Sequence, residues 1–164
     1  MARLMALDVG EARIGVAIGD ATGFLASPYT TLHVTRDEVQ TLKTIQHLID
    51  ETGAEGLVIG LPISLDGEIH SQAKRVQAFA GRLKEHITIP LTFWDERLST
   101  VEAERLLGKR GEAEQGKHYK SGGRRKGDQA KRRRRKNEID ALAAAVILQE
   151  YLDQHMSKTR GSDI

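Results

Sequence analysis

Residues 3–19 read RLMALDVGEARIGVAIG, two apolar runs that flank the short polar turn Gly10-Glu11-Ala12. The runs Arg3–Val9 and Arg13–Gly19 are rich in Leu, Val and Ile, which is typical of largely buried strands. Together they predict a hairpin that opens a sheet. One carboxylate, Asp8, interrupts the first strand near its end, where burial without a partner would be costly.

After residue 19, the spacing of apolar residues alternates between that of strands and that of helices. A third extended segment is expected at 25–34, and apolar residues at helical spacing predict helices over 37–52 and 69–83. Short apolar runs at 57–60 and 91–95 predict two further strands. The order βββαβαβ favours an α/β fold with a mixed five-stranded sheet, because the opening meander suits antiparallel neighbours and the later strands suit parallel ones.

The C-terminal half is expected to hold two more helices. Ser99-Thr-Val-Glu102 has the pattern of a capping box, so a helix should run from there to Leu107. Residues 109–136 show no apolar periodicity and five glycines, which predicts a flexible basic loop. Asn137 is expected to cap the last helix, and 156–164 to form a loose tail. Residues 1–155 would then form one domain.

Composition narrows the function classes. The absence of cysteine excludes disulfides and thiolate metal sites and fits a cytoplasmic protein, and no apolar run is long enough to span a membrane. The net charge of +2 hides an asymmetry. Residues 109–136 hold 13 of the 25 basic residues and three of the 23 acidic ones, so the rest of the chain is acidic. A concentrated cationic segment suggests a polyanionic partner.

Three carboxylate positions are candidates for metal binding, and each has a structural alternative. Asp8 could accept the amides of the next turn or pair with Arg13. Asp95 and Glu96 are adjacent at the end of a strand, so only one of them can easily share a face with Asp8, and spacing alone does not say which. Asp140 could serve the first turn of the last helix. Taken together, carboxylates that converge on one strand edge would suit hard cations such as Mg²⁺ or Mn²⁺.

Several motifs resemble those of the YqgF/RuvX family, in matching order and spacing over about Met1–Leu152. They are Asp8-Val-Gly-Glu-Ala-Arg13-Ile-Gly15-Val-Ala17, Gly60-Leu61-Pro62 with Asp66-Gly67, Asp95-Glu96-Arg97-Leu-Ser99-Thr100, and Ile139-Asp140-Ala-Leu-Ala143-Ala144. The resemblance implies a ribonuclease H-like fold with helices on both faces of the sheet. It also implies a catalytic metal site at Asp8, Glu96 and Asp140, which would choose Glu96 over Asp95.

The resemblance further implies a divalent-metal-dependent nuclease. Family members are linked to maturation of the 5′ end of precursor 16S rRNA, and are also named as Holliday junction resolvases. Structured RNA is therefore the first expected substrate and branched DNA the second, and the second would require a two-fold dimer. A catalytically silent rRNA-binding assembly factor and an actin-like nucleotide-binding module are the remaining alternatives.

Cationic residues are the expected contacts to nucleic acid. Arg13 and Arg97 flank the implied metal site and could hold phosphates, although pairing with Asp8 or Asp95 explains them equally well. The family usually has a short basic loop before the last helix, and the loop of this chain is longer. Its expected phosphate-binding residues are Arg124, Arg125, Lys126, Lys131, Arg132, Arg133, Arg134, Arg135 and Lys136.

Overall fold

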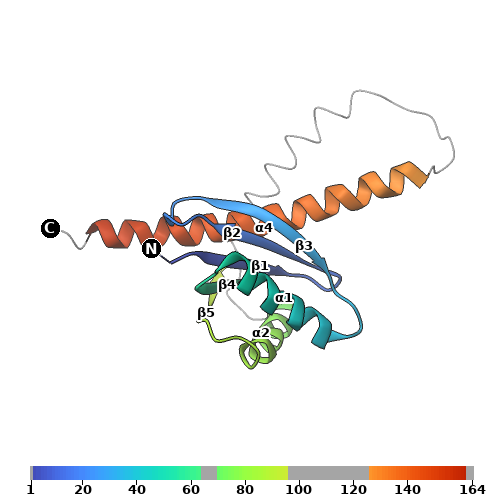
Figure 1. Cartoon of the computed structure of the whole chain (residues 1–164), viewed down its shortest axis with the longest axis horizontal. Helices are drawn as coiled ribbons and strands as arrows, with labels where there is room; N and C mark the ends of the chain where they lie inside the picture. The colour runs from blue at the N-terminus through green and yellow to red at the C-terminus, as the bar shows by residue number, and fades with distance from the viewer. Residues whose placement is uncertain (1, 64–69, 96–125, 162–164) are drawn as a thin grey trace.

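The computed structural model describes residues 2–63, 70–95 and 126–161 (Figure 1). Five strands form one sheet in the order β3-β2-β1-β4-β5. Their bounds are β1 Leu4–Val9, β2 Arg13–Gly19, β3 Ala26–His33, β4 Gly56–Leu61 and β5 Leu91–Asp95. β1, β2 and β3 pair antiparallel, whereas β4 is parallel to both β1 and β5. The mixed sheet and the element order βββαβαβ are therefore confirmed.

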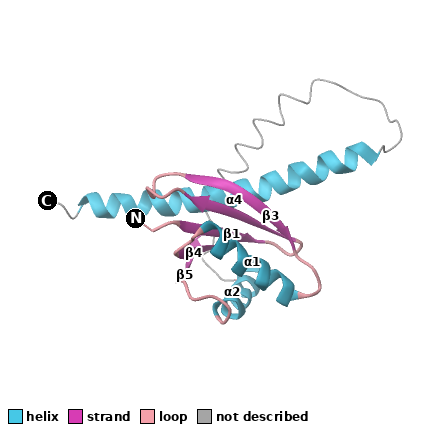
Figure 2. Cartoon of the chain, viewed as in Figure 1, coloured by secondary structure: helices cyan, strands magenta, loops and turns pink. Residues whose placement is uncertain are grey.

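Two helices cover one face of the sheet (Figure 2). α1 spans Glu38–Thr52 and α2 spans Ser71–Lys84, and their apolar stripes meet strand residues such as Leu7, Val16 and Ile59 in the larger core cluster. α1 ends at Gly53, whose φ of 69° is the left-handed conformation that favours glycine at a helix end. The predicted bounds of both helices agree with the structure to within two residues.

A single long helix, α4, covers the opposite face (Figure 1). Its small and aliphatic residues pack on Ala6, Ala17 and Val58 of the central strands, and these residues form a second core cluster. Short side chains on this face let the helix lie close to the sheet. Helices on both faces, as expected from the resemblance, are thus observed.

The start of α4 differs from the prediction. α4 spans Lys126–Gly161, so residues 126–136 are helical rather than loop, Asn137 lies inside the helix rather than at its N-cap, and the helix continues through 156–161. The prediction failed because it relied on apolar periodicity, whereas Arg, Lys and Gln are good helix formers without it. The expected helix over 99–107 and the loop residues 109–125 lie outside the described residues.

The cationic part of α4 projects beyond the edge of the sheet (Figure 1). Every residue from Gly127 to Lys136 is exposed, whereas the next buried residue of α4 is Ala141. Within the described residues, no helix is both long enough and apolar enough to cross a lipid bilayer.

Candidate metal and nucleic-acid site

Asp8 lies on the α4 face of the sheet, close to the end of β1. Strand alternation places it on the same side as Ala6, which packs against α4, and its cross-strand partner on β2 is Gly15. Asp8 is partly exposed, in contrast to the three fully buried residues before it. The carboxylate therefore stands where the buried part of β1 gives way to solvent, beside a position without a side chain.

Gly15 is the place where α4 rests directly on the sheet. A Cβ atom at Gly15 would overlap the backbone carbonyl oxygen of Asp140, and it would also come within 3.0 Å of the amide nitrogen of Ala141. Only glycine leaves room for the helix backbone there. The close approach brings Asp140 of α4 next to Gly15, which in turn lies opposite Asp8, so both acidic residues flank the same glycine.

An ion pair fixes the Asp140 side chain. Arg13 of β2 donates from Nε to Asp140 Oδ2 at 2.5 Å, and the two side chains are 31% and 22% exposed. Arg13 is two residues before Gly15 and shares its face of the sheet. The pairing was not among the alternatives predicted for Arg13. The alternative that Asp140 serves the first turn of its helix is wrong, because the residue lies well inside α4.

The structure also separates Asp95 from this face. Trp94 packs with the α4 cluster and its Nε1 donates to Glu150 Oε2 of α4 at 3.4 Å. Asp95 follows it and is in register with Leu61, which belongs to the cluster under α1 and α2. Alternation therefore puts Asp95 on the other face from Asp8. Glu96 and Arg97 lie outside the described residues.

Oxygen ligands for a hard cation are thus present, but the described part of the chain does not complete a set. Among the residues that the structure describes, no group of three or more His, Cys, Asp or Glu side chains is placed to hold a metal ion. Asp8 and Asp140 supply carboxylates on one face, which is the ligand chemistry that Mg²⁺ and Mn²⁺ prefer.

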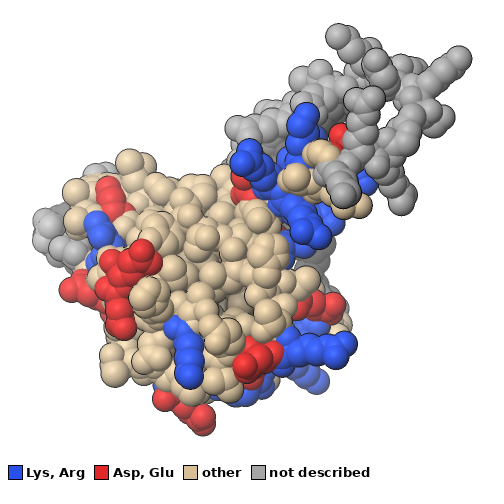
Figure 3. Space-filling model, turned by 45° about the vertical axis from the view of Figure 1, so that its right-hand side comes forward, with Lys and Arg blue, Asp and Glu red and all other residues tan. Residues whose placement is uncertain are grey.

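The cationic segment forms an exposed patch on α4 (Figure 3). Six consecutive residues, Lys131–Lys136, are basic, and successive residues on a helix are rotated by about 100°, so these side chains point in all directions around the axis. Arg124 and Arg125 lie outside the described residues. The segment belongs to the same continuous helix that carries Asp140.

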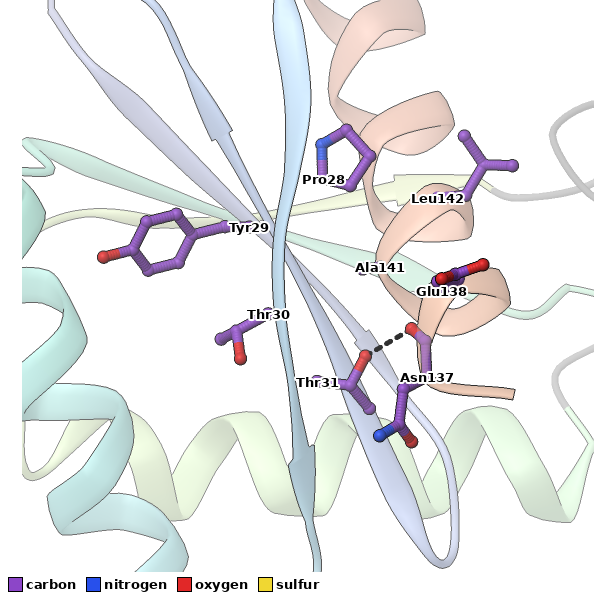
Figure 4. Close-up of a pocket in the computed structure, with 8 residues that line it drawn as sticks. All are labelled: Pro28, Tyr29, Thr30, Thr31, Asn137, Glu138, Ala141 and Leu142. Carbon is purple, nitrogen blue, oxygen red and sulfur yellow. Dashed lines mark hydrogen bonds between the residues drawn. The ribbon is translucent and has the colours of Figure 1, made fainter. Parts of the chain in front are cut away.

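A groove between β3 and α4 was missed by sequence reasoning (Figure 4). It has a volume of about 470 Å³, and it is lined by Pro28, Tyr29, Thr30, Thr31, Asn137, Glu138, Ala141 and Leu142. The Thr31 hydroxyl donates to the backbone oxygen of Asn137 at 2.6 Å and ties the strand to the helix. The side-chain Oδ1 of Asn137 is buried and accepts no hydrogen bond. No sequence signal pointed to it, because Asn137 was interpreted as a cap.

The family model and the relatives that match this chain point to the same protein family. The family model described as RuvX, Holliday junction resolvase, matches residues 2–154. A relative from Roseiflexus sp. (strain RS-1), named "Putative pre-16S rRNA nuclease", is 42% identical over 92% of this chain and 94% of its own length. One of the same name from Desulforudis audaxviator is 40% identical over 94% of this chain and 96% of its own length.

Among solved structures, T. thermophilus RuvC in complex with a Holliday junction substrate has a similar fold. The TM-score is 0.55 at 12% sequence identity, and the alignment covers 96% of this chain and 97% of that chain. At this identity the likeness concerns the fold alone, and it confirms the ribonuclease H-like fold that the sequence motifs implied.

Proposed function

The chain belongs to the RuvX family, and from that premise we propose that it is a divalent-metal-dependent nuclease that processes the 5′ end of precursor 16S rRNA. The observation that carries the proposal is the placement of Asp8 and Asp140 on either side of Gly15. Two carboxylates from elements far apart in sequence are brought to one partly exposed point on the sheet, within reach of a polyanionic strand held by the cationic end of α4.

Asp8, Asp140 and Glu96 would hold one or two Mg²⁺ or Mn²⁺ ions. Asp95 lies on the opposite face of the sheet from Asp8, which supports Glu96 rather than Asp95 as the third ligand. The bound metal would supply Lewis-acid activation of water and charge stabilisation at the phosphodiester. Asp8 and Asp140 would orient that metal, and the packing of α4 on Gly15 would hold Asp140 at a fixed height above the sheet.

Arg13 would contact both the proposed metal ligand Asp140 and the nucleic-acid substrate. Its Nε–H holds Asp140 in one rotamer through a charge-assisted hydrogen bond. The remaining guanidinium N–H groups of a partly exposed arginine can donate to a phosphate oxygen next to the metal. Arg13 would therefore orient Asp140 and attract the scissile strand.

The cationic residues of α4 would bind phosphates without reading sequence. Lys131–Lys136 are exposed and lie on the helix that carries Asp140, so a strand bound to them is held close to the carboxylates. Arg97, Arg124, Arg125 and Lys126 are proposed as further phosphate contacts. Neutralising Arg132–Arg135 should weaken binding and flatten its salt dependence, since each lost phosphate contact reduces the slope by about 0.7 on a single strand. The matched control also removes four exposed cations, all of them away from α4: Arg36, Lys43, Lys74 and Lys84, each replaced by Gln.

The decisive experiment compares wild type with Asp8→Asn on precursor 16S rRNA, with Mg²⁺, Mn²⁺ or EDTA. The substitution keeps the shape of the side chain and removes its charge, so cleavage should be lost while RNA binding in EDTA stays nearly unchanged. Cleavage at the wild-type rate by Asp8→Asn would remove this residue from the mechanism. Cleavage that persists in EDTA would contradict the proposed dependence on a divalent metal.

Cleavage of a four-way DNA junction is the second candidate, because the family model carries the resolvase description. Resolution needs two symmetric cuts, and therefore a two-fold dimer, whereas trimming one RNA end needs a single copy. Junction DNA in the same assay, together with the oligomeric state in solution, separates the two substrates.

A further inference from the structure

We propose that His33 and Arg13 form a binding subsite for a phosphate that flanks the scissile phosphodiester, between the cationic helix and the carboxylates. The inference rests on the proposed nuclease function and adds to it His33, a residue outside the sequence motifs. It depends on three features of His33: the face of the sheet on which it lies, its lack of a partner in the described chain, and its position between α4 and Asp8.

His33 lies on the α4 face of the sheet, opposite Arg13. It is the last residue of β3 and is in register with Arg13, two residues beyond the pair formed by Gly15 and Thr31. The Thr31 hydroxyl donates to the backbone oxygen of Asn137, so Thr31 faces the helix (Figure 4). Strand alternation therefore places His33 on that face too. Directly opposed residues such as Arg13 and His33 have Cβ atoms about 5 Å apart.

The side chain of His33 is exposed and has no partner in the described part of the chain. No hydrogen bond or ion pair joins it to another residue that the structure describes. Opposite it, Arg13 uses Nε–H for Asp140 and keeps its two terminal nitrogens for other acceptors. A ring nitrogen of histidine donates in either tautomer. The two side chains thus present donors to one point of the surface, and a ligand that suits them carries acceptor oxygens, as a phosphate does.

The course of α4 along β3 sets the level of His33 against the helix. Hydrogen bonds tie Thr31 to Asn137 and the start of β3 to Gln149, so the helix runs antiparallel to the strand. His33 lies about 7 Å beyond Thr31 along the strand, a length that corresponds to about four residues of helix. His33 is therefore level with about Arg133, one of the exposed cations of α4.

The carboxylates lie on the other side of His33. Asp8 is on β1, two strands from β3, and it is in register with Gly15. Strand spacing and rise then put the Cα atoms of Asp8 and His33 about 12 Å apart. His33 is too far away to touch a phosphate held at the carboxylates, but a neighbouring phosphate is within its reach. A strand that runs from the cations of α4 to the carboxylates would pass over His33 and Arg13.

A series of charge substitutions at His33 tests whether a phosphate binds there. Binding of single-stranded RNA is measured by fluorescence anisotropy in EDTA, without cleavage. His33→Ala should bind about fivefold more weakly than wild type, because one hydrogen bond to a charged group is lost. His33→Asp should bind more weakly still, by about tenfold or more. His33→Arg should bind more tightly, with a salt dependence steeper by about 0.7.

His47 provides the matched control for these substitutions. It is an exposed histidine of α1, on the face of the sheet opposite α4. Salt screens a charge at that distance from the strand, so His47→Ala, His47→Asp and His47→Arg should each change RNA affinity by less than about twofold. Thermal unfolding by circular dichroism establishes that each variant is folded.

Modification of histidines in the wild-type protein locates the strand without any substitution. Diethyl pyrocarbonate acylates exposed imidazole rings, and mass spectrometry of the peptides reports each histidine separately. Saturating single-stranded RNA should slow the modification of His33 severalfold. The exposed His47 and His86 should react at the same rate with and without RNA.

Equal modification of His33 with and without saturating RNA would overturn the proposal. So would RNA affinities of folded His33→Asp and His33→Arg that differ no more than those of the two corresponding His47 variants. Neither readout involves cleavage, so the outcomes are distinguishable from failure of the proposed nuclease function. A protein that protects His33 with RNA but never cleaves would refute the nuclease and keep the subsite, whereas a metal-dependent nuclease with unprotected His33 would do the reverse.

Discussion

Gly15→Ala is the substitution for which the structure gives the clearest expectation. The new Cβ would overlap the carbonyl oxygen of Asp140. The main chain fixes the position of the Cβ, and the oxygen belongs to the main chain, so neither atom can rotate away. To restore ordinary contact, α4 would have to retreat from β2 by at least about 1 Å, which loosens the packing of Ala144 and Leu148 on the sheet. Overpacking of this kind costs about 1–3 kcal/mol.

The same shift should affect chemistry more than stability. For a chain of this size, a loss of about 1–3 kcal/mol lowers the melting temperature by roughly 3–10 °C, which leaves the protein folded at room temperature. A displacement of about 1 Å in a residue that positions a catalytic group can reduce the rate about 100-fold. Metal-dependent cleavage should thus fall by about two orders of magnitude in a protein that still folds.

Gly81→Ala is the matched control. Gly81 lies on α2, and a Cβ there would meet no atom within 4 Å. Alanine in an exposed helical position should stabilise the protein by about 0.5–1 kcal/mol, with cleavage unchanged. Thermal unfolding by circular dichroism and a cleavage assay on the same preparations measure both effects. A Gly15→Ala protein with the wild-type melting temperature would show that α4 does not rest on this glycine, and destabilisation with full cleavage would show that Asp140 needs no such placement.

Two further predictions concern charge. A hydrogen bond from the hydroxyl of Thr22, and further ones from the amides of Leu25 and Phe24, lower the pKa of Asp20 below its usual value of 3.8. The ionised Asp20 therefore stabilises the fold fully at pH values above 3.8, and this stabilisation is lost as the pH falls through the lowered pKa. The difference in urea midpoint between wild type and Asp20→Asn should therefore shrink from pH 7 to about pH 3, and a constant difference would contradict this. Separately, Lys131–Lys136 repel one another along the helix, so a polyanion such as heparin should raise the temperature at which the helical signal in circular dichroism is lost, and Arg132–Arg135 neutralised to Gln should remove that increase.

The sequence predicted the sheet and its two shorter helices because burial leaves a periodic signal there. β2 and β5 have the predicted bounds, and α1 ends at Thr52, where its last residue was predicted. Each of these segments buries apolar residues on one or both of its faces, and the spacing of those residues along the sequence differs between a strand and a helix. The prediction depends on local pattern alone, which is why it works where each segment packs on its neighbours.

The N-terminal part of α4 lacked such a signal. Residues 127–136 are exposed and carry no apolar stripe, so a helix rich in cations was interpreted as a loop. The error carried over to Asn137, which was interpreted as a cap rather than as the residue where the helix joins the sheet. The contact between Gly15 and Asp140 could not be predicted either, because it joins two backbones far apart in the sequence.

The correction to α4 changes how the cations and the carboxylates relate to each other. On a flexible loop, Lys131–Lys136 would only raise the local concentration of nucleic acid. On a continuous helix, they stand at a fixed distance from Asp140, which Arg13 and Gly15 hold in place on the sheet. A phosphate bound to the helix then fixes the position of the rest of the strand relative to Asp8 and Asp140. Positioning of this kind favours cleavage at one phosphodiester over its neighbours, as accurate trimming of an RNA end requires.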